Sequence, residues 1–136
     1  MPESYVIDSQ HRVVFSRSTG VFTYAEFLEH MARMRADPRF RPDYDQLVDC
    51  RATTAFELTG DQIAALAART IFSVQARRGF VVSSSLQYGL SHMLASHLEL
   101  RGETGVRIFH DLPSALAWLN LPGDFDPFGA PPGAQP

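Results

Sequence analysis

The sequence of 136 residues contains no lysine, and all twelve of its basic residues are arginine. A Schiff base, a Walker-type phosphate loop and a Ser-Lys nucleophile pair each depend on an amine or ammonium that arginine cannot supply. These enzyme classes are therefore excluded.

The sequence also lacks cysteine pairs, long apolar runs and a strong charge. Its one cysteine, Cys50, cannot form an internal disulfide or a zinc finger. No apolar run approaches 18 residues, and the first residues do not resemble a secretory signal, so we expect a cytoplasmic protein with no membrane span. A formal net charge of −3 gives no field that would attract nucleic acid, and we expect no nucleic-acid partner.

The residues that are present suffice for one folded domain. The apolar fraction is 45% and includes ten Phe and one Trp, enough for a hydrophobic core at this length. From Pro122 onward, five prolines and three glycines occur in fifteen residues. We therefore expect a domain over residues 1–121 and a disordered tail over 122–136.

The order of the expected elements indicates an α/β fold. β-branched and aromatic runs predict strands at 5–7, 13–15, 46–50, 79–83 and 105–110. Four helices are expected to follow the caps Thr23, Thr59, Ser84 and Asp111. The first two strands form a hairpin, and strands joined through helices run parallel, so the sheet is mixed and five-stranded.

The pattern also predicts a strand end, a turn and the buried face of a helix. Gly20 is expected to end the second strand, and a nine-residue turn is expected between Cys50 and the second helix. The third helix is expected to bury an apolar stripe of six residues. Its members are Leu86, Leu90, Met93, Leu94, His97 and Leu98.

Several segments, in this order and spacing, are similar to one known family. They are Tyr24-Ala25-Glu26, 37–40 (Asp-Pro-Arg-Phe), 47–51 (Leu-Val-Asp-Cys-Arg), 88–93 (Tyr-Gly-Leu-Ser-His-Met), 106–111 and 115–119. Together they resemble the small bacterial SpoIIAA-like proteins of the STAS superfamily, over roughly residues 4 to 121. The resemblance implies a single STAS-like domain that binds a partner protein or a small ligand without turning it over.

The resemblance also raises the question of a phosphorylation switch. Antagonists of this type carry an Asp-Ser pair after the middle strand, and the serine is phosphorylated. Here Asp49 is followed by Cys50, and the nearest hydroxyls are those of Thr53 and Thr54. These two threonines are the phosphorylation candidates, and the alternative is that they only shape a turn.

For the remaining candidate residues, a functional role has to be weighed against a purely structural one. Cys50 is either a nucleophile or, more commonly for a lone cysteine in an apolar strand, core filling. Phe56 is either an exposed contact for a partner or part of the core. His92 and His97 diverge on a helix, so we expect no metal site. We also expect no cofactor and no catalytic residue.

Three classes of function follow. The first is a regulatory module that binds another protein around 49–59 and 83–88, with these candidate residues: Asp49, Arg51, Thr53, Thr54, Phe56, Ser84 and Tyr88. The second is a carrier of a small apolar ligand in a pocket under the second and third helices. The third is an uncharacterised enzyme. Separately, edge strands and exposed apolar side chains in loops are compatible with a homodimer.

Overall fold

The computed structural model describes residues 3–125, which form one five-stranded sheet with four helices. The strands are β1 (Glu3–Asp8), β2 (Val13–Thr23), β3 (Asp45–Glu57), β4 (Arg78–Val81) and β5 (Val106–Phe109). The helices are α1 (Tyr24–Ala36), α2 (Gly60–Ala68), α3 (Ser85–Leu100) and α4 (Leu112–Trp118).

The sheet is mixed, as the sequence predicts. β1 and β2 pair antiparallel, and β2 through β5 pair parallel in the order of the chain. Val48 lies beside Phe80, which lies beside Ile108, on three neighbouring parallel strands. The expected α/β fold class is therefore confirmed.

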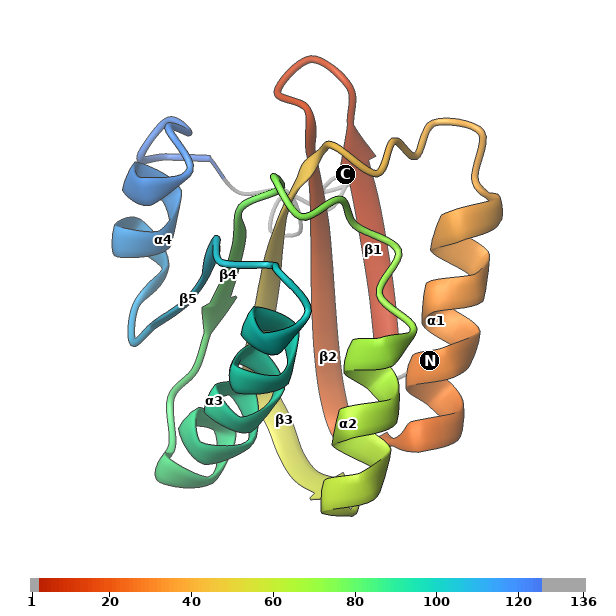
Figure 1. Cartoon of the computed structure of the whole chain (residues 1–136). Coiled ribbons are helices and arrows are strands. Elements are labelled where there is room, and N and C mark those ends of the chain that lie inside the picture. Colours follow the sequence, from red (N-terminus) through yellow and green to blue (C-terminus); the bar gives the residue numbers. More distant parts are fainter. Residues whose placement is uncertain (1–2, 126–136) are drawn as a thin grey trace.

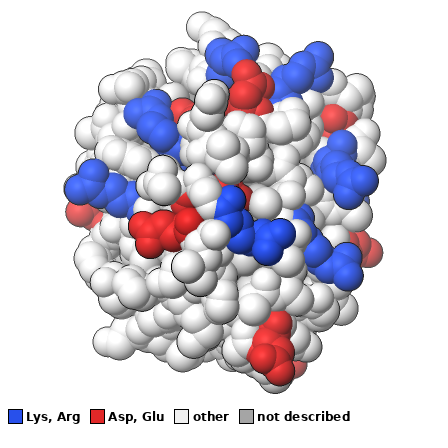
Figure 2. Space-filling view, in the orientation of Figure 1, with Lys and Arg blue, Asp and Glu red and all other residues white. Residues whose placement is uncertain are grey.

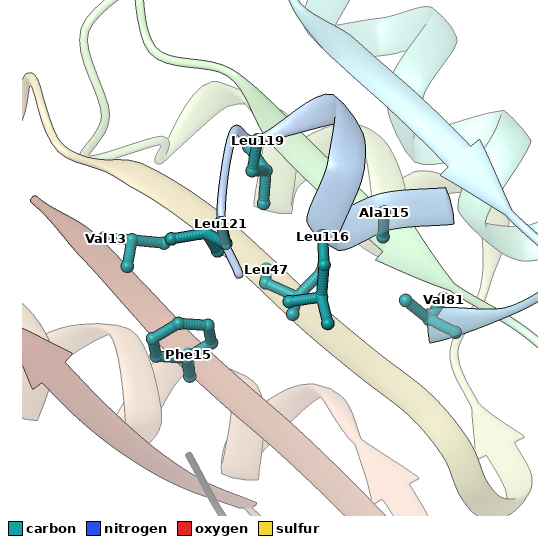
Figure 3. Packing of buried hydrophobic residues seen from close by; sticks show 8 residues of the cluster. All are labelled: Val13, Phe15, Leu47, Val81, Ala115, Leu116, Leu119 and Leu121. Carbon is teal, nitrogen blue, oxygen red and sulfur yellow. The ribbon is translucent and has the colours of Figure 1, made fainter. Parts of the chain in front are cut away.

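The helices cover the two faces of the sheet unequally. Each right-handed crossover moves to the next strand in the same direction, so α1, α2 and α3 lie together on one face (Figure 1). On the opposite face α4 packs Ala115 and Leu116 against Phe15, Leu47 and Val81. Figure 3 shows Leu116 of α4 beside Leu47 of β3 in this layer. The core therefore has two layers separated by the sheet.

Local capping signals place the helix starts correctly. Thr23, Thr59, Ser84 and Asp111 each accept a hydrogen bond from a backbone N–H in the first turn of their helix. These bonds satisfy donors that have no partner inside the helix. All four expected caps are confirmed.

Two strands are longer than expected. β2 continues past Gly20, which adopts a φ of +69° where the β2–β3 register shifts. β3 continues past Cys50 to Glu57, and Phe22 pairs with Phe56 in this added stretch. The expected strand end and the expected nine-residue turn are therefore wrong, because a bulge at a left-handed glycine lets the pairing resume.

The orientation of α3 is also different from the expected one. Its buried side chains include the polar Gln87 and Ser91, whereas Leu86 is 56% exposed and Met93 is 40% exposed. Leu98 is buried as expected. The apolar stripe is thus wrong at two of its members, because hydrogen bonds described below hold Gln87 inward.

The chain after α4 returns to the N-terminal hairpin. The ring of Phe125 lies 4.9 Å from that of Phe15 and 5.0 Å from that of His11, measured between centroids. The rest of the expected tail, residues 126–136, lies outside the described residues. None of the helices within residues 3–125 has the length and apolar character needed to cross a membrane.

Candidate functional site

The carboxyl ends of β2 to β5 and the starts of all four helices share one edge of the molecule. Ligands of open α/β sheets usually bind at this edge, because loops and helix N-termini gather there. The candidate residues from the sequence come from two segments near this edge: the part of β3 from Asp49 onward, which extends beyond its pairing with β4, and the start of α3.

Gln87 of α3 joins these two segments. Its Nε2 donates to the carbonyl oxygens of Thr53 (2.9 Å) and Arg51 (3.5 Å), and its Oε1 accepts from the backbone N–H of Ser83 (2.7 Å). β4 stops pairing with β3 after Val81, so the glutamine occupies the edge of β3 that a neighbouring strand would otherwise fill. At this point the sequence predicts only the helix cap Ser84, and it gives no sign of the contact made by Gln87.

Asp49 and Arg51 form a close pair on the α4 side of the sheet. Asp49 Oδ1 accepts from Arg51 Nε at 2.9 Å, and Oδ2 accepts from Nη2 at 3.0 Å. Arg17 Nε lies 3.9 Å from the same carboxylate. Burial alone would raise the pKa of Asp49, but the hydrogen bonds from Arg51 outweigh it, and the pKa lies below its usual value. The carboxylate of Asp49 is therefore ionised and bound to Arg51 by two hydrogen bonds, at the point where β4 stops pairing with β3.

The two phosphorylation candidates differ in access. Thr53 is buried, and its Oγ1 lies 2.8 Å from Ser18 Oγ. Thr54 is exposed. A kinase could reach Thr54 on the folded protein, whereas Thr53 would require the β2–β3 pair to open.

Ser84 and Tyr88 lie in an open recess at the start of α3, together with Ser83, Ser85 and His110. The Tyr88 ring stacks on His110 with centroids 5.5 Å apart and an interplanar angle of 16°. Tyr88 is nevertheless 41% exposed. The stack fixes the orientation of an exposed aromatic side chain.

Phe56 turns into the molecule, away from the other candidates. Its ring packs 5.5 Å from that of Phe22, and it lines a cavity of about 50 Å³ between the sheet and the three helices. The other lining residues are Phe22, Phe27, Val48, Cys50, Leu58, Ile63, Leu66, Phe80, Leu90, Ser91 and Leu94. Cys50 is thus part of an apolar wall, as the core-filling interpretation expects.

A chain of buried polar side chains crosses the sheet under the helices, and sequence reasoning did not find it. His30 Nε2 lies 3.2 Å from Ser16 Oγ, which accepts from Gln46 Nε2 at 3.1 Å. Gln46 Oε1 accepts from Arg78 Nε at 3.0 Å, and Arg78 Nη1 donates to Glu103 Oε1 at 3.1 Å. The chain links α1, three strands and the loop after α3. Its members are scattered singly in the sequence, so no spacing signals it.

No cluster of three or more His, Cys, Asp or Glu side chains within residues 3–125 could hold a metal ion. The chain has no matching family model, and no curated protein is significantly similar to it.

Among solved structures, the chain is similar to an uncharacterized protein from the DUF3478 family with a SpoIIAA-like fold, from Shewanella loihica PV-4. The two share 16% identity with a TM-score of 0.56, over 86% of this chain and 93% of the other. At this identity the likeness concerns the fold, and it agrees with the resemblance drawn from the sequence. The chain therefore has a SpoIIAA-like fold.

Proposed function

We propose that this protein is a non-catalytic regulatory module that binds another protein through the surface where β3 meets α3. We call this the junction surface and define it as Asp49, Arg51, Thr54, Ser84 and Tyr88. The observation that supports it most directly is the double contact of Gln87 with the Arg51 and Thr53 carbonyls. That contact joins two segments that lie more than thirty positions apart in the sequence.

The composition of the junction surface suits a protein partner. Arginine and tyrosine are enriched at the centres of protein interfaces, because both give large contact area with directional hydrogen bonds. Here the Arg51 guanidinium is held by Asp49, and the Tyr88 ring is held by His110. Ordering these side chains before binding lowers the entropy cost of forming an interface.

Thr54 is a candidate for regulation of that binding. It is exposed on the strand that carries Arg51. A phosphate there would add a charge of about −1.5 to −2 at pH 7 and change the electrostatics of the whole surface. We expect Thr54→Glu to alter partner affinity by about tenfold, which corresponds to about 1.4 kcal/mol.

The test is capture of partners on the purified full-length chain from its native source, followed by mass spectrometry. A partner counts only if Tyr88→Arg releases it and Ala32→Arg, at an exposed position on α1, does not. If every captured protein is retained equally by both variants, the junction surface is not the binding site.

A second candidate function, the carrying of a small apolar ligand, is favoured by the almost wholly apolar lining of the cavity under α2 and α3. Its volume of about 50 Å³ is well below the roughly 300–1,000 Å³ of typical ligand sites, which places this function second. Xenon is a suitable probe, since it is small and dry apolar cavities bind it. We expect xenon to raise the melting temperature of the wild type but not of Cys50→Leu, which fills the cavity.

A further inference from the structure

The outward side of α3 is unusually apolar. Among the residues that the structure describes, seven large apolar side chains are markedly exposed, and four of these are on α3. Leu86, Met93 and Leu100 are 56%, 40% and 85% exposed and recur every seven residues, so they form one stripe along the helix. A stripe of this kind is uncommon on a protein surface that contacts only water.

The same side of α3 also lacks charge. Residues 85–98 contain no Asp, Glu, Lys or Arg, whereas the exposed positions of α1 include Glu29, Arg33 and Arg35. In Figure 2 the lower left of the molecule, where Figure 1 places α3, is largely uncharged. A solvent-facing helix normally carries its charges on this side, and depletion of charge marks the centre of an interface.

Gly89 gives an independent indication that a neighbour approaches this stripe. It lies in the middle of α3, between Leu86 and Met93 on the exposed side, and a Cβ built on it would meet nothing within 4 Å. Glycine in a helix interior is less favourable than alanine, and no neighbour among residues 3–125 comes close enough to require it here. A glycine at such a position allows the backbone of another helix to approach closely.

We propose that α3 pairs antiparallel with α3 of a second copy of this chain. The stripe alternates large and small residues, Leu86, Gly89, Met93, Ser96 and Leu100, at the spacing of a coiled-coil seam. In an antiparallel pair centred near residue 91, Met93 lies over the partner's Gly89, and Leu86 lies over the partner's Ser96. Leu86 and Met93 then each enter the space left by a small residue, Leu100 extends past the start of the partner's helix, and the contact closes on itself with two-fold symmetry.

Charge complementarity favours this arrangement and its direction. Glu99 is the acidic residue of the last turn of α3, where the negative end of the helix dipole disfavours it. The first turn of α3 contains no acidic residue of its own. In the antiparallel pair, Glu99 lies near the start of the partner's α3, at the positive end of that helix. A parallel pair would place the two Glu99 side chains side by side.

This self-association goes beyond the proposed function, because the seam uses none of the side chains that define the junction surface. The first test is sedimentation analysis of the full-length chain. We expect a dimer for the wild type and for Ala32→Arg, and a monomer for Met93→Arg, which places a guanidinium in the seam. Retained circular dichroism shows that Met93→Arg is folded.

Gly89→Ala separates the dimer contact from a folding role. The variant should raise the melting temperature of the dilute, monomeric protein, because alanine is the better helix former. It should nevertheless weaken the dimer at least tenfold, because the added methyl lies where the partner's Met93 packs. Misfolding would lower both quantities together.

Engineered disulfides test the direction. The double variant Leu86→Cys/Ser96→Cys should crosslink two chains on oxidation, and neither single variant should do so, since each position faces the other one across the seam. A wild type that remains monomeric at its highest soluble concentration would overturn the proposal. So would a dimer that Met93→Arg and Gly89→Ala leave unchanged, or efficient crosslinking of the single variants.

Discussion

Arg78 and Glu103 form an ion pair inside the core, with side chains that are 8% and 1% exposed. The guanidinium also lies 4.6 Å from the centroid of the Phe72 ring. Glu103 Oε2 is buried and has no hydrogen-bond partner among residues 3–125. Moving such a pair out of water costs free energy, and so does removing one of its partners. The pair therefore adds little to the free energy of unfolding, and its main effect is to fix the position of the loop after α3 against β4.

Removing only the cation should therefore be severe. We expect Arg78→Met to lower the free energy of unfolding by about 3–5 kcal/mol, because the Glu103 carboxylate is left in the core without a cation. Urea denaturation measures this loss. The double variant Arg78→Met/Glu103→Leu should recover most of it, and a double variant as unstable as the single one would contradict this account.

His30 should make stability depend on pH. Burial, with a smaller contribution from Arg33, lowers the pKa of His30 from 6.5 to about 4 in the folded protein. Between these two pH values the unfolded chain binds a proton that the folded protein does not. The free energy of unfolding therefore falls as the pH drops from 6.5 to about 4, and below pH 4 it no longer changes on account of His30. The total loss is at most about 3 kcal/mol.

Urea denaturation across this pH range should show the slope in the wild type and a shallower slope in His30→Gln. Glutamine keeps a polar group near Ser16 but does not titrate. Equal slopes in the two proteins would show that His30 is not the responsible group.

At the scale of elements, the two segments of the junction surface depend on Gln87. Gln87→Ala would leave the Thr53 carbonyl and the Ser83 N–H without these bonds, and we expect a loss of roughly 1–3 kcal/mol in the free energy of unfolding. Amide hydrogen exchange should become faster around residues 51–53 and 83–85. Gln75→Ala, at an exposed position, is the matched control and should change neither quantity.

The helices and strands that could be predicted from the sequence are those set by local signals. Thr59 caps α2 because its own hydroxyl reaches a backbone N–H three residues on. The apolar run at 79–83 identifies β4, because a strand covered on both faces needs apolar side chains throughout. Neither inference depends on how distant parts of the chain meet.

The features that could not be predicted depend on pairing across the sheet. Gly20 looks like a strand end, but β2 resumes because β3 lies beside it and supplies the hydrogen bonds. Gln87 looks like a surface residue, but it turns inward because β4 ends early and leaves carbonyls of β3 open. For the same reason the sequence could suggest that 49–59 and 83–88 act together, but not which side chains face outward.

For the molecule as a whole, Phe125 links the end of the described chain to its beginning. Its ring packs on Phe15 of β2 and on His11 of the first hairpin turn. Phe125 is half-buried, so Phe125→Ala should lower the free energy of unfolding by roughly 1–2 kcal/mol, less than for a fully buried phenylalanine. Thermal denaturation measures this change, and Val74→Ala, at a side chain that is 53% exposed, should stay within about 0.5 kcal/mol of the wild type.

The agreement between chain order and strand order has a consequence for synthesis. Each strand from β2 onward docks on the one made just before it, so no strand has to insert between two that are already paired. A nascent chain can therefore extend its sheet from one side as it leaves the ribosome, because each strand that has already folded offers its free edge to the next strand.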